Sequence, residues 1–286
     1  MRKTWGAIAL AAAATLALAA CGSATGSGAT SGTASSGVAA TTGAVTKLTI
    51  GASPVPQAQI LQFVQDNLAK GAGLDLKIVT FDDYVLPNTS LAEGDIDANY
   101  FQHLPYYESQ VKDQGFKFDH FAGIHIEPYA AYSSKYKKIE DVPDGAKLGI
   151  TNDPGNQARA LQLLVKNNLI TLKDTGDTPP TLLDIATSTK NFRFVEAAPE
   201  QLVRSLDDVD LAIINGNYAL QGGLNPATDS LLLESGVDSP YANFLAVRAQ
   251  DKSNPAIVTL DGLLHSPEVK AFIQKQWPDG GVLPAF

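Results

Sequence analysis

The chain has 286 residues, with 21 Lys and Arg against 30 Asp and Glu, so its formal net charge at pH 7 is −9. An acidic chain without a run of basic side chains is poorly suited to the nucleic-acid backbone, which argues against nucleic-acid binding. The single cysteine excludes an intramolecular disulfide.

The N-terminus has the pattern of an export signal. A basic start, Met1 to Lys3, is followed by an almost unbroken apolar run from Trp5 to Ala20. This order is typical of a secretory signal peptide, and the run is shorter than the roughly 20 residues of a transmembrane helix. Cys21 directly follows Leu-Ala-Ala, which resembles a bacterial lipobox. We therefore expect residues 1–20 to be removed and Cys21 to carry a lipid anchor; an ordinary signal peptide with an incidental cysteine is the alternative.

The next segment is almost entirely Gly, Ser, Ala and Thr, without a charged residue. Such a sequence cannot bury enough apolar area to offset its conformational entropy, so we predict a flexible tether over residues 21–46. The tether would let the remaining part of the chain, residues 47–286, reach away from the membrane surface.

The first half of that part alternates predicted strands and helices. Polar and apolar residues alternate from Lys47 to Ala52, and the prolines that follow open a helix with one apolar stripe. The predicted order is strand 47–52, a helix that stops near Gly71, strand 74–81, a short helix 86–91 and strand 96–101. This order implies parallel strands with helices on the faces of the sheet. In such sheets ligands bind at the carboxyl ends of the strands.

Aromatic side chains gather at the end of the third predicted strand. They are Tyr100, Phe101, His103, Tyr106 and Tyr107. A buried strand would more often use aliphatic residues. Amphipathic rings suit a pocket for a ligand that is partly apolar and partly polar, although rings at a strand end can also simply fill a core.

A long extended segment, 118–133, follows and has the form of a crossing between two lobes. The pattern then restarts with strand 147–151, helix 155–168, strand 192–196, a helix around 200–206 and strand 211–215. Strand 242–248 and helices 255–264 and 267–277 end the chain. We predict a hinged two-lobe α/β protein with a ligand cleft between the lobes. Lobe 1 would comprise residues 47–130 and 236–286, and lobe 2 residues 131–235.

The start of the second lobe offers a candidate anion site. Asp153 is suited to cap a helix and Pro154 to begin it. Asn156 and Arg159 then lie near one face of the first two turns. A helix N-terminus beside an arginine suits an anion, since arginine can bind a carboxylate through two parallel hydrogen bonds. An ordinary capped helix with a solvated arginine is the alternative.

Amide side chains adjoin two other predicted strands. Asn215 follows the apolar strand 211–214, with Tyr218 close behind it, and Asn243 precedes an apolar run. Asn215 could accept a hydrogen bond from an ammonium group, although its Asn-Gly sequence also favours a plain turn. A carboxylate site, an amide acceptor and an aromatic pocket together describe an α-amino acid with an apolar side chain.

The sequence gives little support to catalysis. It contains no phosphate loop, no Gly-x-Ser-x-Gly and no His-Glu-x-x-His. His120 and His125 are five apart on a predicted extended segment, so they would point to opposite faces and are poorly placed to share a metal. We therefore predict no enzyme activity, no cofactor and no metal.

Together these motifs resemble the NlpA lipoproteins, the methionine-binding components of bacterial ABC importers. The resemblance rests on residues 94–99, 101–106, 152–159, 204–210, 215–219 and 239–241, which occur in the order found in the family. It runs from about Lys47 to the C-terminus. It implies a two-lobe type II periplasmic-binding fold and a lipid anchor on the extracytoplasmic face of the cell membrane. It also implies delivery of methionine to a permease with a cytoplasmic ATPase.

The resemblance further implies roles for single residues. Arg159 should bind the ligand carboxylate, and Asn215 and Asn243 should hold its α-amino and carboxylate groups. Aromatic rings should line the thioether pocket, because their edges favour sulfur. These rings are those of Tyr84, Phe101, His103 and Tyr129. The predicted ligand-binding set is completed by Asn156 and Tyr218.

Other interpretations stay open at this point. Members of the family differ between L-methionine, D-methionine and small methionine-containing peptides, and the sequence does not discriminate between them. A receptor for another apolar amino acid would show the same motifs. A third interpretation is a surface lipoprotein that serves as an adhesin on the same fold.

Overall fold

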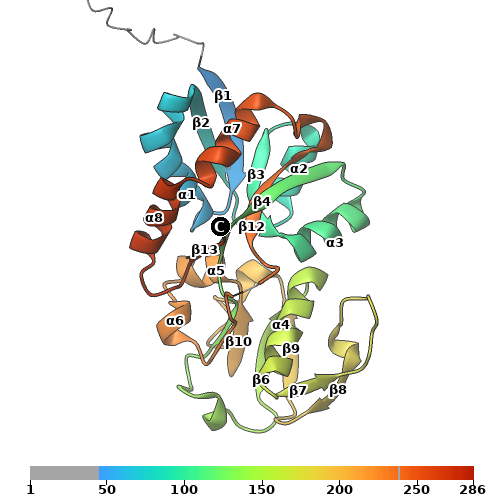
Figure 1. The fold of residues 1–286 in the computed structure, drawn as a ribbon. Coiled ribbons are helices and arrows are strands. Elements are labelled where there is room, and N and C mark those ends of the chain that lie inside the picture. Colours follow the sequence, from blue (N-terminus) through green and yellow to red (C-terminus); the bar gives the residue numbers. More distant parts are fainter. Residues whose placement is uncertain (1–44, 238) are drawn as a thin grey trace, which may run out of the picture. The chain divides into compact units, whose positions relative to one another are not determined.

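In the computed structural model, residues 45–237 and 239–286 are described, and two β-sheets with flanking helices organise them (Figure 1). The predicted signal peptide, Cys21 and nearly all of the predicted tether lie outside the described residues. None of the helices in the described part of the chain combines the length and apolarity needed to cross a membrane.

The first sheet has six strands in the order β13-β4-β12-β3-β1-β2. The strands are β1 (Thr46–Ala52), β2 (Leu74–Thr80), β3 (Ala98–His103), β4 (Phe118–Ile126), β12 (Asn243–Arg248) and β13 (Leu283–Pro284). β1 pairs in parallel with β2 and β3, as the β-α-β-α-β pattern predicts, and β12 is antiparallel between β3 and β4. Both ends of the described chain therefore build one sheet.

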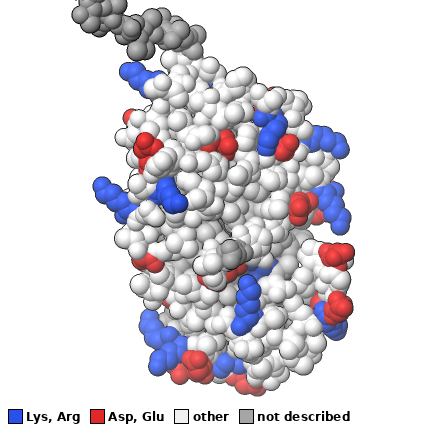
Figure 2. Space-filling model, in the orientation of Figure 1, with Lys and Arg blue, Asp and Glu red and all other residues white. Residues whose placement is uncertain are grey.

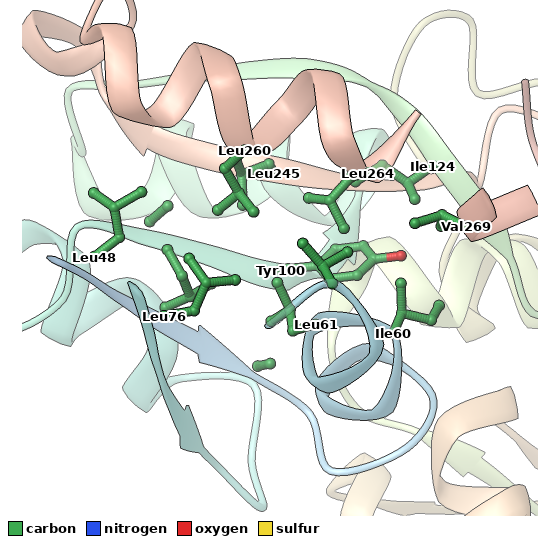
Figure 3. Packing of buried hydrophobic residues seen from close by; sticks show 14 of the residues in the cluster. Leu48, Ile60, Leu61, Leu76, Tyr100, Ile124, Leu245, Leu260, Leu264 and Val269 are labelled. Carbon is green, nitrogen blue, oxygen red and sulfur yellow. The ribbon is translucent and has the colours of Figure 1, made fainter. Parts of the chain in front are cut away.

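Five α-helices pack on this sheet and form the first lobe with it. They are α1 (Gln57–Val64), α2 (Leu86–Glu93), α3 (Leu104–Gln114), α7 (Pro255–Leu264) and α8 (Pro267–Gln276). Side chains of β12 alternate between two apolar clusters, because successive residues of a strand point to opposite faces. Leu245 packs in the core under α1, α7 and α8 (Figure 3), while Phe244 packs on the other face with Tyr107 of α3.

The helical segment that begins with α1 is longer than the sequence pattern predicts. A π-helical turn, Gln65–Ala69, and a 3-10 turn, Lys70–Ala72, continue it. It ends at Gly73 rather than at Gly71, because Gly73 is the residue that adopts the left-handed conformation of a C-terminal cap, with φ 73°.

The second sheet has five strands in the order β11-β5-β10-β6-β9. They are β5 (Ala130–Tyr132), β6 (Lys147–Thr151), β9 (Arg193–Ala197), β10 (Leu211–Ile214) and β11 (Leu232–Leu233). The second lobe also contains α4 (Pro154–Lys166), α5 (Gly216–Gln221), α6 (Pro226–Asp229) and a small hairpin of β7 (Ile170–Leu172) and β8 (Ile185–Ser188). The sequence pattern missed this hairpin. The prediction of a helix around 200–206 is also wrong, because a 3-10 turn, Pro199–Gln201, is the helical element assigned there.

Two short connections join the sheets. Residues 127–129 lead from β4 to β5, and the segment after β11 leads back to β12. The extended segment predicted over 118–133 is therefore two strands in different sheets. The two connections touch, because the amide of Glu234 donates to the carbonyl of Tyr129 at 2.8 Å.

Charges of both signs are interspersed over the face drawn in Figure 2, with no patch of a single sign.

Candidate ligand-binding site

A small, partly open cavity is lined by residues of both lobes. Its lining consists of Tyr84, Phe101, Gln102, His103, Tyr106, Glu127, Asn156, Arg159, Asn215, Gly216 and Asn243. Most of the predicted ligand-binding set is therefore brought together, and only Tyr129 and Tyr218 are absent from the lining.

Three rings form an aromatic wall on the side of the first lobe. The ring centroids of Tyr84, Phe101 and Tyr106 are 5.6–6.0 Å apart, in tilted and edge-to-face arrangements that aromatic pairs favour. Tyr106 belonged to the aromatic run seen in the sequence but not to the predicted site. The alternation of β3 places Phe101 on the cavity, whereas Tyr100 packs in the core of the first lobe.

His103 is a neutral donor at the boundary between the lobes. Its Nδ1 accepts from the amide of Tyr106 at 3.3 Å and so caps α3, which leaves Nε2 to donate to Asn156 Oδ1 at 3.0 Å. Burial, aided by the charge of Arg159, lowers the pKa of His103 to about 3. The imidazole therefore adds no positive charge to the cavity at neutral pH.

The amides of the second lobe are oriented by this same network. Asp153 caps α4 as predicted, and its Oδ1 accepts from the backbone and side-chain nitrogens of Asn156 at 2.8 and 3.0 Å. Asn156 Oδ1 accepts in turn from Asn215 Nδ2 at 2.8 Å. Asn215 Oδ1 is then left buried without a partner among the described residues. An unpaired buried acceptor is costly, so this oxygen is a candidate contact for a ligand donor.

Arg159 is held on one edge by a carboxylate that the sequence analysis missed. Its Nη2 lies 2.5 Å from Glu234 Oε2 and its Nε 3.1 Å from Glu234 Oε1. Nη2 also donates to the carbonyl of Glu127 at 3.0 Å. Nη1 makes no hydrogen bond within the described part of the chain. The arginine side chain is 4 % exposed, so this nitrogen is the one left to serve the cavity.

Two aromatic rings contact the guanidinium of Arg159. The Arg159 Cζ lies 4.9 Å from the ring centroid of Tyr129 and 4.2 Å from that of Tyr241. Tyr129 therefore supports the arginine rather than lining the cavity. Such contacts with aromatic faces favour a cation. Glu234 gave no sequence signal, because it lies in an irregular segment far from Arg159 along the chain. Tyr241 belongs to the 239–241 motif of the family resemblance but was not among the predicted site residues.

Tyr218 lies behind the aromatic wall. Its ring centroid is 5.0 Å from that of Tyr84, and its hydroxyl donates to the carbonyl of Asp82 at 3.1 Å. Tyr84 makes a second link between the lobes, because its hydroxyl donates to Asn217 Oδ1 at 2.5 Å. These bonds hold the lobes together beside the cavity.

Glu127 places a second buried carboxylate in the cavity wall. Its Oε1 accepts from Gln57 Nε2 at 2.6 Å and from His125 Nε2 at 2.7 Å. Its Oε2 accepts from the amide of Asn217 at 2.9 Å. The same Gln57 nitrogen donates to Asn243 Oδ1 at 3.1 Å. Four segments distant in the sequence thus meet at this carboxylate.

The two lobes, the short connections and the polar and aromatic cavity define a ligand-binding protein of the type II periplasmic-binding class. A family model described as NlpA lipoprotein matches residues 48–286. The chain belongs to the NlpA lipoprotein family. Over residues 45–237 and 239–286, no group of three or more His, Cys, Asp or Glu side chains is arranged to hold a metal ion.

Relatives and solved structures agree with this assignment. The methionine-binding lipoprotein MetQ of Bacillus subtilis is 39 % identical over 242 residues, which cover 83 % of this chain and 88 % of the relative. The D-methionine-binding lipoprotein MetQ of Escherichia coli is 40 % identical over 237 residues, 82 % of this chain and 87 % of the relative. A nutrient-binding protein from Burkholderia cenocepacia bound to methionine superimposes with a TM-score of 0.80 at 45 % identity, over 84 % of this chain and 100 % of that one.

Proposed function

We propose that this protein captures methionine, in its L or D form, outside the cytoplasm and delivers it to an ABC importer. The observation that carries the proposal is the composition of the cavity. Arg159 Nη1 and Asn215 Oδ1 have no hydrogen-bond partner among the described residues, and both residues line the cavity together with three aromatic rings. The names of the relatives and the methionine-bound neighbour support the same ligand.

The cavity matches the parts of methionine one by one. Arg159 Nη1 suits the carboxylate, and Asn215 Oδ1 suits the ammonium group. Tyr84, Phe101 and Tyr106 offer ring edges to the thioether. Within this proposal, Asn243 and His103 complete the polar wall.

The proposal includes a membrane anchor and a hinge. Residues 1–20 would be removed, Cys21 would be lipidated, and residues 21–46 would tether the protein to the extracytoplasmic face of the membrane. The partners would be a permease and its cytoplasmic ATPase. Lobe 1 would comprise residues 47–130 and 236–286 and lobe 2 residues 131–235, so that the lobes close on the ligand by bending at the two connections.

Calorimetric titration tests the ligand. Residues 45–286 contain every described helix and strand, so they are the protein to use, after unfolding and refolding to remove any ligand carried through purification. L-methionine, D-methionine, leucine and Gly-Met are titrated separately. We expect a dissociation constant of about 1 µM or lower, roughly −8 kcal/mol, for a methionine species. A folded protein that binds leucine but no methionine species would contradict the proposal.

A further inference from the structure

The cavity contains more buried negative than positive charge among the described residues. Arg159 is the only Lys or Arg in its lining, and Glu234 already neutralises it in a close ion pair. His103 is neutral because burial lowers its pKa to about 3. Glu127 is 6 % exposed, and among the described residues the cavity lining offers it no Lys or Arg besides Arg159. Buried charges are costly unless they are paired.

The hydrogen bonds around Glu127 indicate the ionised form. Three donors point at its two oxygens, and a carboxylate can accept from all of them. A proton on Oε1 would face one of the two donors that meet at that oxygen. The side-chain amide of Gln57 is consistent with an ionised Glu127, because its nitrogen donates to two acceptors, Glu127 Oε1 and Asn243 Oδ1.

His125 does not supply the missing positive charge. Its Nε2 donates to Glu127 Oε1, and its Nδ1 pairs with the hydroxyl of Tyr100. That hydroxyl has no other partner among the described residues, so its hydrogen is satisfied only if it is donated to Nδ1. A nitrogen that accepts carries no proton, so the imidazole is neutral. Burial also raises the pKa of Tyr100, which keeps the hydroxyl protonated.

Two residues with amide oxygens, Asn215 and Asn243, line the same cavity as Glu127. The Glu127 side chain lies against Gly216, where an added Cβ would come within 2.4 Å of Glu127 Cβ. The preceding residue contributes Asn215 Oδ1, which is buried and unpartnered, and Asn243 Oδ1 shares a donor with the carboxylate. Glu127 Oε2 accepts only one hydrogen bond and has capacity for another. A group with several N–H donors and a positive charge fits this corner of the cavity.

We propose that Glu127 is the counter-ion for the ligand's α-ammonium group and makes the cavity selective for amino acids over the corresponding hydroxy acids. This inference deepens the proposed function and rests on it. A zwitterion would satisfy Arg159 Nη1 with its carboxylate and Glu127 with its ammonium group. A 2-hydroxy acid would bring only a negative charge and would leave Glu127 unpaired.

The test compares two ligands that differ in one group. L-methionine and 2-hydroxy-4-(methylthio)butanoate are titrated into the wild-type protein and into Glu127→Gln. The variant keeps an oxygen for the amide of Asn217. Its new NH₂ group would face the donors Gln57 and His125, so denaturant unfolding is measured alongside to establish that the variant folds. Glu196→Gln is the matched control, because Glu196 is exposed, lies outside the lining and likewise accepts from a glutamine, Gln157, at 2.7 Å.

We expect the wild type and the Glu196→Gln control to prefer methionine by about 10-fold or more, the effect of one hydrogen bond to a charged group. Glu127→Gln should lose this preference through weaker methionine binding, while its affinity for the hydroxy acid stays the same or rises. Equal losses for both ligands would assign Glu127 a structural role and overturn the proposal. If the variant does not fold, the wild-type preference decides, and equal wild-type affinities overturn it.

The same experiment separates this inference from the proposed function. If the wild type binds methionine but Glu127→Gln keeps the full preference for the amine, only the inference fails. If the wild type binds leucine instead, the proposed function fails, and leucine with 2-hydroxyisocaproate becomes the test pair. If the folded wild type binds neither amine, both fail.

Discussion

Arg159 and Glu234 form a buried ion pair that fixes the arginine before any ligand arrives. Their side chains are 4 % and 5 % exposed, and Nη2 lies 2.5 Å from Oε2. Glu234 lies in the connection that returns to the first sheet, and its Oε2 also accepts from the amide of Tyr129 in the other connection, at 3.2 Å. Glu234 thus occupies the Nε–Nη2 edge of the guanidinium, and the carbonyl of Glu127 takes the remaining hydrogen of Nη2. The ligand carboxylate is left with Nη1.

Arg159→Ala should therefore affect both binding and stability. We expect the affinity for methionine to fall by more than about 100-fold. The variant loses a charged hydrogen bond to the ligand and also the buried positive charge, and the two losses add. The free energy of unfolding should also fall, by about 3–5 kcal/mol, because Glu234 is left buried and unpaired. Denaturant unfolding and calorimetry measure the two effects.

A double variant separates the two roles of the pair. Arg159→Met with Glu234→Leu replaces the ion pair by apolar side chains and should recover most of the lost stability, since such replacements are often neutral or stabilising. Binding should stay lost. Recovery of binding in the double variant would show that Arg159 does not contact the ligand.

The neutral His103 should make stability depend on pH in acid. Its pKa falls from 6.5 to about 3 on folding, so between these values the unfolded chain binds a proton that the folded chain does not. Stability is full above pH 6.5 and decreases as the pH falls toward 3, by up to about 1.4 kcal/mol per pH unit. His103→Asn keeps a cap for α3 and removes the titration. Its unfolding free energy should therefore fall less between pH 6.5 and 4 than that of the wild type, and equal slopes would contradict this account.

Gly155 allows the two lobes to approach. An added Cβ at this position would lie 3.0 Å from Tyr106 Cα and 3.3 Å from the carbonyl oxygen of Pro105, both backbone atoms of the first lobe. The added methyl group of Gly155→Ala should therefore keep the cleft partly open. We expect the affinity for methionine to fall by about 10-fold, which corresponds to the loss of about one charged hydrogen bond to the ligand. Stability should hold or rise by up to about 1 kcal/mol, since alanine favours helices.

Gly262→Ala is the control for this effect. It lies in α7, and an added Cβ there meets nothing within 4 Å. We expect the same gain in stability, about 0.5–1 kcal/mol, without any change in affinity. If both glycine variants bind methionine like the wild type, the contact between Gly155 and Tyr106 does not limit closure.

Cys21 should decide where the protein is found. In cells, the wild type should fractionate with membranes and partition into detergent, because acyl chains anchor it. Cys21→Ser should shift it to the aqueous phase at unchanged methionine affinity, since the proposed site lies within residues 84–243. Mass spectrometry of the mature N-terminus identifies the acylation. A wild-type protein that starts at another residue without acyl groups would contradict the anchor.

The sequence determined the local parts of this protein. The Asp153 cap, the parallel strands of the first lobe and the Phe101–His103 end of β3 follow from patterns within a few residues of one another. Such patterns can be predicted because capping, strand alternation and proline placement are short-range effects. Local patterns also marked Arg159, Asn215 and Asn243 as candidates, the family resemblance gave them roles toward the ligand, and the structure places them around one cavity.

Only the tertiary structure determined which charged side chains meet around the cavity and how they are oriented. Glu234 meets Arg159 from 75 residues away, and Glu127 meets Gln57 from 70 and Asn217 from 90. Neither carboxylate lies in a motif, since each stands in a short connection whose partners come from other elements. Burial then makes both carboxylates important for binding and stability. Electrostatic interactions of an ion pair or of an unpaired carboxylate are much stronger in a buried cavity than in water. Short-range patterns therefore fix the elements, while the balance of charge in the cavity is a property of the folded chain.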